Sequence, residues 1–168
     1  MRLKARDIVK AAMIGTLYVL LTYVQTALFP GSTSAAIQFR ASEALMMLAL
    51  FSPTAIYGLT IGCCVANIFS GMPLDIVIGS AATLLAGILI YQTRNLKFKG
   101  FPVLSVIFPA VCNGLIVGAE IQFFYIGGFE IVSYLTQALL VFIGELGVSI
   151  ILGIPLYYVI QKTKLKNF

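Results

Sequence analysis

Several charged and amide side chains that could bind a small molecule lie inside segments that are otherwise apolar. A charged residue at the centre of a membrane helix costs roughly 2.5 to 3.5 kcal/mol, so those that remain generally have a use. Asn113 and Glu120 are seven residues apart, on one face of a helix. Tyr134, Gln137 and Glu145 share one face of the next apolar segment. Two polar stripes that face each other predict a binding pocket.

Further polar side chains lie in the same half of the neighbouring segments, namely Arg40, Glu43, Asn67 and Asp75. The alternative to a pocket is a set of interhelical hydrogen bonds that join helices without a ligand. Such bonds need not gather at one depth, so the common depth of these residues favours a pocket open to the outside. Arg40 and Glu43, three residues apart on one helical turn, form either a salt bridge with each other or contacts to a ligand.

The connection that leads to Arg40 is rich in turn residues. Residues 29–34 read FPGSTS, which favours a loop, and Phe39 follows shortly afterwards. A mobile connection that carries this aromatic ring is expected to close over a planar ligand. An exposed loop without a ligand role is the alternative.

The residue types needed for common catalytic and metal sites are missing from the sequence. There is no His, and Cys63, Cys64 and Cys112 lie in apolar segments without metal-ligand spacing. The sequence has no P-loop, no nucleophile elbow and no helical HExxH pattern. We therefore expect no metal site, no cofactor and no enzymatic activity in this chain.

The apolar segments that position these residues are best explained as membrane helices. Hydrophobic residues make up 60% of the 168, charged residues only 10%, and the mean hydropathy is +1.02, which exceeds what a soluble core requires. A membrane helix needs about 20 apolar residues. Breaks at Pro, Gly and charged residues predict an all-α integral membrane bundle of six transmembrane helices in a single domain, residues 1–168. The helices are expected at 8–28, 41–52, 54–71, 75–92, 102–126 and 132–161.

The basic residues predict the orientation of this bundle. Of the eleven Lys and Arg residues, ten lie in the N-terminal, central and C-terminal connections, and Arg40 is the exception. Lys and Arg are retained in cytoplasmic loops, so both termini are expected in the cytoplasm. The basic clusters flank apolar spans and do not line an aromatic-studded face, so they indicate lipid headgroups as partners and exclude nucleic acid.

Small residues recur at the spacing that lets membrane helices approach closely. They include Gly58 and Gly62, for which packing inside the bundle is expected. Ala11 and Gly15 lie in the cytoplasmic half of the first helix. Their small side chains would allow close packing either with another helix of the bundle or with a partner protein.

The sequence resembles the substrate-binding S components of energy-coupling factor (ECF) vitamin importers. Within them it is similar to the QueT group, proposed importers of queuosine precursors. The resemblance rests on residues 37–48 (IQFRASEALMML), on Gly62, Asn67 and Ser70, and on residues 75–84 (DIVIGSAATL). It implies a subunit of the plasma membrane that binds its substrate outside and then docks on a T component and two ATPase subunits. The family's Ala-xxx-Ala docking pattern corresponds to Ala11 and Gly15 here, with Gly in place of the second Ala.

The substrate that the resemblance implies is queuine or another 7-deazaguanine base. One carboxylate, from Glu120 or Glu145, would accept its adjacent N–H and amine. Amides would bind its carbonyl, and the second acid or Asp75 would face an aminomethyl cation on some precursors. The amide candidates are Asn67, Asn113 and Gln137, and the stacking candidates are Phe39, Tyr125 and Tyr134. An S component for another vitamin, a small membrane enzyme and a structural helper protein are the competing interpretations.

Overall fold

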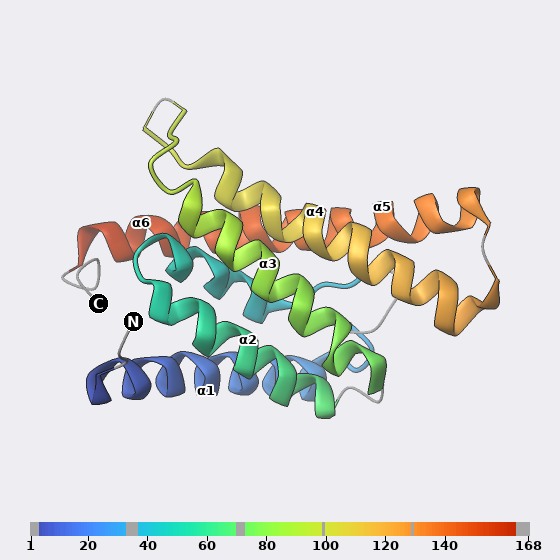
Figure 1. The fold of residues 1–168 in the computed structure, drawn as a ribbon, viewed down its shortest axis with the longest axis horizontal. Helices are drawn as coiled ribbons and strands as arrows, with labels where there is room; N and C mark the ends of the chain where they lie inside the picture. The colour runs from blue at the N-terminus through green and yellow to red at the C-terminus, as the bar shows by residue number, and fades with distance from the viewer. Residues whose placement is uncertain (1–3, 33–36, 70–72, 99, 129, 164–168) are drawn as a thin grey trace.

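The computed structural model describes all residues except 1–3, 33–36, 70–72, 99, 129 and 164–168. The regular secondary structure of the described residues consists of helices, apart from one isolated β-bridge between Phe98 and Phe101 (Figure 1). The elements are α1 (Ala5–Leu28), η1 (Ala41–Leu50), α2 (Pro53–Ile68), η2 (Pro73–Ile76), α3 (Ile78–Gln92), α4 (Val103–Glu120), η3 (Ile121–Gly127), α5 (Ile131–Val148), η4 (Ser149–Gly153) and α6 (Ile154–Lys162). The all-helical fold of six main segments is confirmed, because η2 with α3, α4 with η3, and α5 through α6 each continue as one helical segment.

Four of these segments are long and apolar enough to cross a membrane: Ala5–Leu28, Pro73–Gln92, Val103–Gly127 and Ile131–Lys162. Two apolar helices, Ala41–Leu50 and Pro53–Ile68, are shorter. Large apolar side chains also cover the outside of the bundle, as Met13, Leu20 and Leu28 on α1 illustrate. Such an apolar surface is stable in lipid and not in water. The structure is therefore that of an integral membrane protein.

The short second helix is a 3-10 helix and not an α-helix. A 3-10 helix rises about 2.0 Å per residue against 1.5 Å in an α-helix, so the same residues reach farther. Eight of its ten residues are buried. It ends at Leu50, two residues before the predicted end, and Pro53 opens α2 as a first-turn proline, one residue before the predicted start at 54.

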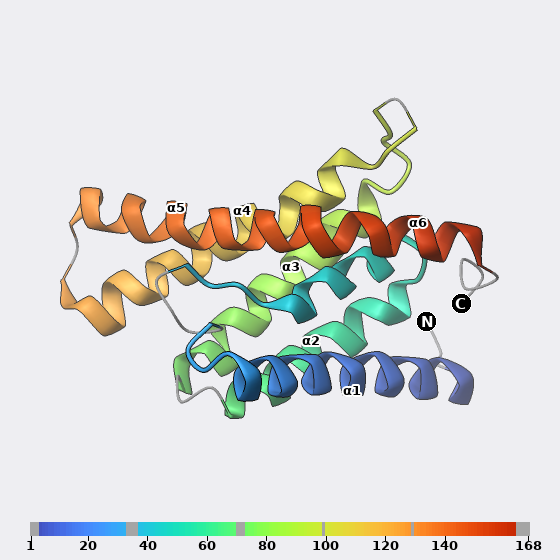
Figure 2. The same cartoon turned by 180° about the vertical axis from the view of Figure 1, so that it is seen from behind.

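The η1 helix lies in the middle of the bundle, between α1 on one side and α5 and α6 on the other (Figure 2). Its Met46 and Met47 are fully buried and belong to the main hydrophobic core, together with Leu59 of α2 and Ile90 of α3. Because η1 contacts the surrounding helices, the residue that precedes it, Arg40, is held at the centre of the protein.

Small residues allow α1 and α2 to approach closely. A Cβ atom added to Gly15 would lie 3.0 Å from the backbone oxygen of Gly58, and one added to Gly58 would lie 2.5 Å from the oxygen of Ala11. A Cβ atom added to Gly62 would lie 2.9 Å from the Cα atom of Gly15. Of the two roles expected for Ala11 and Gly15, packing inside the bundle is therefore present in the structure.

Candidate ligand-binding site

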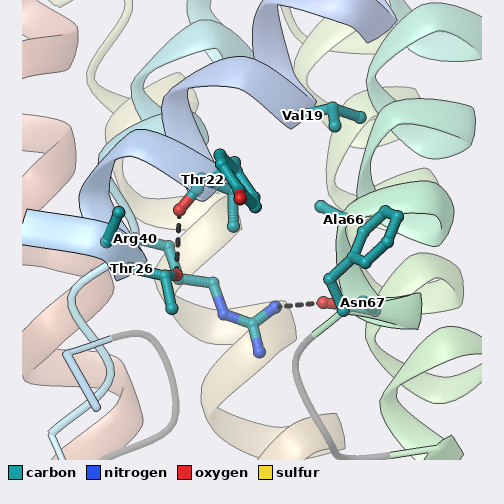
Figure 3. Close-up of a pocket in the computed structure, with 9 residues that line it drawn as sticks. Val19, Thr22, Thr26, Arg40, Ala66 and Asn67 are labelled. Atoms are coloured by element: carbon teal, nitrogen blue, oxygen red, sulfur yellow. Dashed lines mark hydrogen bonds between the residues drawn. The ribbon is translucent and has the colours of Figure 1, made fainter. Parts of the chain in front are cut away.

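A buried ion pair links the start of η1 to η2. The guanidinium of Arg40 pairs with the carboxylate of Asp75, and both side chains are nearly inaccessible. Arg40 Nη1 also donates to Asn67 Oδ1 at 3.3 Å (Figure 3), and Asn67 Nδ2 donates to the Asp75 backbone oxygen at 2.7 Å. These three residues, all of which the sequence placed in one half of neighbouring segments, contact one another.

Gly79 on α3 makes room for this set. A Cβ atom at this position would collide with Asp75 Oδ1 and would lie 3.1 Å from Asn67 Nδ2. The first turn of α3 therefore packs directly against the Asp75 carboxylate, and only glycine fits there without displacing it.

Glu43, three residues after Arg40, turns to other partners. The Tyr18 hydroxyl of α1 donates to Glu43 Oε1, and Thr83 of α3 lies 3.5 Å from the same oxygen. Thr83 Oγ1 is also 3.4 Å from the sulfur of Cys63 on α2. The structure thus gives Arg40 an ion pair with Asp75 and Glu43 a hydrogen bond from Tyr18, where the sequence had suggested a salt bridge between Arg40 and Glu43 or contacts to a ligand. Contact of either residue with a ligand stays a prediction.

The predicted acids of the fifth and sixth segments are buried as well. Glu120 at the end of α4 is 2% exposed and interacts electrostatically with Asp75 and Arg40. Glu145 on α5 is 1% exposed and faces the side chain of Asn113 on α4. The face that carries Asn113 and Glu120 thus points inward, as its spacing predicted.

The site has more hydrogen-bond acceptors than the described residues satisfy. Among the described residues, buried carboxylate oxygens without a donor are Glu43 Oε2, Asp75 Oδ1, Glu120 Oε1, Glu120 Oε2 and Glu145 Oε2. An unsatisfied buried polar group costs about 1 to 3 kcal/mol. Four acids surround one arginine, so the arrangement favours a ligand that is rich in N–H donors or positively charged. No three described His, Cys, Asp or Glu side chains are arranged to hold a metal ion.

A cavity of about 200 Å³ reaches this region between α1 and α2 (Figure 3). Its lining includes Arg40 and Asn67 of the buried set, together with Tyr23, Thr26 and Phe69. Ordinary ligand sites begin at about 300 Å³. The cavity is therefore smaller than an ordinary ligand site.

Gln25, near the end of α1, fastens the loop beside this cavity, a role that sequence reasoning did not assign. Its Nε2 donates to Ser32 Oγ at 3.0 Å and to the Phe39 backbone oxygen, while its Oε1 accepts from the Ala41 N–H at 2.7 Å. The Phe39 N–H donates to the Ser32 oxygen at 2.9 Å. The amide thus holds both ends of the predicted lid against α1; part of that lid, residues 33–36, lies outside the described residues.

Four predicted site residues are less buried than Arg40, Asn67 and Asp75. Phe39 is 36% exposed, and Tyr125 on η3 is 44% exposed although it interacts with Glu120. Tyr134 donates from its hydroxyl to the Leu115 backbone oxygen of α4 at 3.3 Å, and Gln137 is half-buried on α5. Contact of these four with a ligand stays a prediction.

Sequence reasoning gave no role to Tyr18 or Thr83. Tyr18 is 1% exposed on a helix whose other large side chains mostly face outward, and Thr83 is equally buried. No spacing pattern in the sequence identifies these two residues. Their contacts with Glu43 are seen only in the structure, where Glu43 lies between α1 and α3.

The fold and the site together define a helical membrane protein with a buried polar centre that is rich in acids. The chain belongs to the QueT transporter family, whose family model matches residues 8–162. It is also 36% identical over 95 residues to the protein named Queuosine precursor transporter QueT from Lactococcus lactis subsp. cremoris (strain MG1363). That match covers 53% of this chain and 53% of the relative, so it spans about half of each protein. No solved structure matches the chain significantly.

Proposed function

We propose that this chain is the substrate-binding S component of an ATP-driven ECF importer in the plasma membrane. It captures a queuosine precursor or queuine, a 7-deazaguanine base, from outside the cell. The observation that supports this most directly is the excess of buried acceptor oxygens around the Arg40–Asp75 pair. Membership of the QueT transporter family and the name of the Lactococcus relative support the same substrate class.

The deazaguanine edge presents an N–H and an amine side by side, which a single carboxylate accepts with both oxygens. Glu120 is the first candidate because neither of its oxygens has a donor among the described residues. Glu145, with one such oxygen, is the second. The carbonyl of the base would accept from Asn67, Asn113 or Gln137.

A precursor that carries an aminomethyl group adds a cation to this edge. Asp75 Oδ1 and the second glutamate are the acceptors for it, since Arg40 neutralises only one of the four acids. Stacking on Phe39, Tyr125 or Tyr134 would contribute roughly 1 to 3 kcal/mol, as base–aromatic contacts do in nucleic-acid sites.

Calorimetric titration of the purified protein tests this function. We expect aminomethyl-deazaguanine and queuine to bind more tightly than riboflavin, thiamine or biotin. Tighter binding of one of those vitamins would assign the chain to another substrate, and failure to bind any small molecule would favour a helper protein without a transport ligand. Activity of the isolated chain on any of them would indicate an enzyme.

Delivery of the substrate is proposed to require a T component and two ATPase subunits. An apolar groove of about 600 Å³ lies between α1 and α2, lined by Ala11, Ala12, Gly15 and Thr16 on α1 and by Tyr57 and Ile61 on α2. A helix of the T component is proposed to occupy it, since small side chains allow close helix approach in lipid.

Uptake assays in cells that contain the partner subunits separate docking from binding. Ala12 is exposed and lines the groove, so Ala12→Trp is expected to keep ligand affinity and to abolish uptake. Leu139→Trp, on the exposed face of α5, is the matched control and should transport normally. Normal uptake by Ala12→Trp would remove the groove as the coupling surface.

A further inference from the structure

A second polar pocket lies at the opposite end of the bundle, where both α3 and α6 end. It has a volume of about 280 Å³ and is lined by Leu50, Phe51, Arg94, Asn95, Lys97, Pro102, Tyr157 and Gln161. Two of these residues are cationic and none is acidic. The pocket therefore carries a positive charge that no lining carboxylate balances, which suits an anionic ligand.

Two contacts with Tyr91 fix the orientation of the Arg94 side chain in this pocket. Its guanidinium carbon lies 3.9 Å from the centre of the Tyr91 ring, and its Nη1 donates to the Tyr91 backbone oxygen at 2.6 Å. These two contacts fix the side chain, while a guanidinium offers five N–H donors in a planar fork that matches phosphate oxygens.

The opposite wall comes from α6. Gln161 Nε2 donates to the Tyr157 hydroxyl at 2.5 Å, so that hydroxyl keeps its own proton for donation to a ligand. Tyr157 is 2% exposed and is packed edge-on against Phe101, with ring centres 5.4 Å apart. The Tyr157 ring that carries this hydroxyl is thus held in place by packing against Phe101.

The hairpin that carries Lys97 also presents apolar side chains to the outside. Phe98 and Phe101 exchange backbone hydrogen bonds of 2.9 and 3.0 Å, and Gly100 adopts a positive φ of 83° between them. Leu96 and Phe98 are 61% and 69% exposed. The hairpin projects from the bundle near the chain termini (Figure 1), where the basic residues predict the cytoplasmic membrane surface.

We propose that this pocket binds the phosphate of an anionic phospholipid from the cytoplasmic leaflet. Arg94 and Lys97 contact the headgroup, while Leu96 and Phe98 insert among the neighbouring acyl chains. Basic pockets beside membrane helices bind such headgroups, and exposed apolar residues next to them are typical of segments that lie in the interface. A free phosphate would contact the cations alone, whereas the exposed Leu96 and Phe98 side chains beside them suit a ligand that also has acyl chains.

Native mass spectrometry of the full chain in detergent tests the proposal by titration with phosphatidylglycerol and phosphatidylcholine. We expect wild type to retain phosphatidylglycerol preferentially, and the double variant R94Q/K97Q to bind it about 30-fold more weakly, the effect of two basic contacts. The matched control K4Q/R6Q removes the same charge from the start of α1 and should bind like wild type. Equal phosphatidylglycerol binding by R94Q/K97Q, or an equal loss in both double variants, would overturn the site.

Two further measurements keep the result interpretable. Lys97 is exposed, so Lys97→Glu should fold normally and also lose the lipid; normal retention by this variant would contradict the proposal. Inorganic phosphate at millimolar concentration should not displace phosphatidylglycerol from wild type. Displacement would reassign the pocket to free phosphate, and competition by a glutamate-rich peptide, with no lipid binding, would reassign it to a protein partner.

Discussion

Arg40 and Asp75 form an ion pair in the interior of the protein, although 35 residues separate them in the sequence. Arg40 immediately precedes η1, and Asp75 lies in η2, just before α3. The pair therefore ties the central 3-10 helix to the end of the bundle at which the cavity opens. Asn67 bonds to both partners, so three separate elements meet at one charged centre.

The first prediction concerns this pair. Asp75→Asn removes the carboxylate that is paired directly with the Arg40 guanidinium, and breaking a buried pair in this way costs about 3 to 5 kcal/mol. We expect a clear loss of thermal stability in detergent. The double variant Arg40→Gln/Asp75→Asn should lose less than the sum of the two single variants, because each single variant already loses the same interaction between the two side chains. Additive losses would show that the two side chains are not energetically coupled.

The second prediction separates ligand binding from stability at Glu120. Neither carboxylate oxygen has a donor among the described residues, and Asp75 is a like-charged neighbour. Glu120→Gln should therefore keep or raise the melting temperature, while the affinity for the deazaguanine base falls by about 1 to 3 kcal/mol. Calorimetric titration and thermal denaturation of the same sample measure both effects.

Glu145→Gln is the comparison variant. If it loses affinity and Glu120→Gln does not, Glu145 is the carboxylate that accepts the base. Unchanged affinity in both variants would move the acceptor to Asp75 or Glu43.

The third prediction concerns the loop fastened by Gln25. Gln25→Ala removes the amide that joins Ser32, Phe39 and Ala41 to α1. The loop ends should then be released, so ligand dissociation should become faster while the melting temperature falls by only a few degrees. Stopped-flow dissociation measures the first effect. Thr136→Ala, at a partly exposed intrahelical bond of α5, serves as control, and an unchanged dissociation rate in Gln25→Ala would remove the loop as a lid.

The fourth prediction tests the contact of α1 with α2. A Leu side chain at Gly15 would meet the backbone of Gly58 and Gly62, which cannot give way as a side chain can. We expect Gly15→Leu to destabilise the protein by about 1 to 3 kcal/mol or more and to weaken ligand binding. Gly147→Leu, where the surrounding space is open, should be tolerated. Equal melting temperatures for the two variants would show that α1 and α2 pack less closely than described.

Much of the fold follows from the sequence because lipid imposes strong rules on local composition. Apolar segments of sufficient length must be helical in a bilayer, and Pro53 and the polar connections mark where they end. The inward direction of Asn113, Glu120 and Glu145 also follows, because an ionisable or amide group facing lipid would be costly.

What only the tertiary structure decided is which of these buried groups meet. Spacing placed Arg40 within one turn of Glu43, but Arg40 precedes η1 with an extended backbone, and the packing of η1 between its neighbours brings Arg40 to Asp75 and Glu43 to Tyr18. Likewise, the small size of Gly15 permits close approach to any helix, and packing alone selects α2. A sequence fixes helix faces through local periodicity, whereas pairing between faces depends on contacts between residues far apart in the chain.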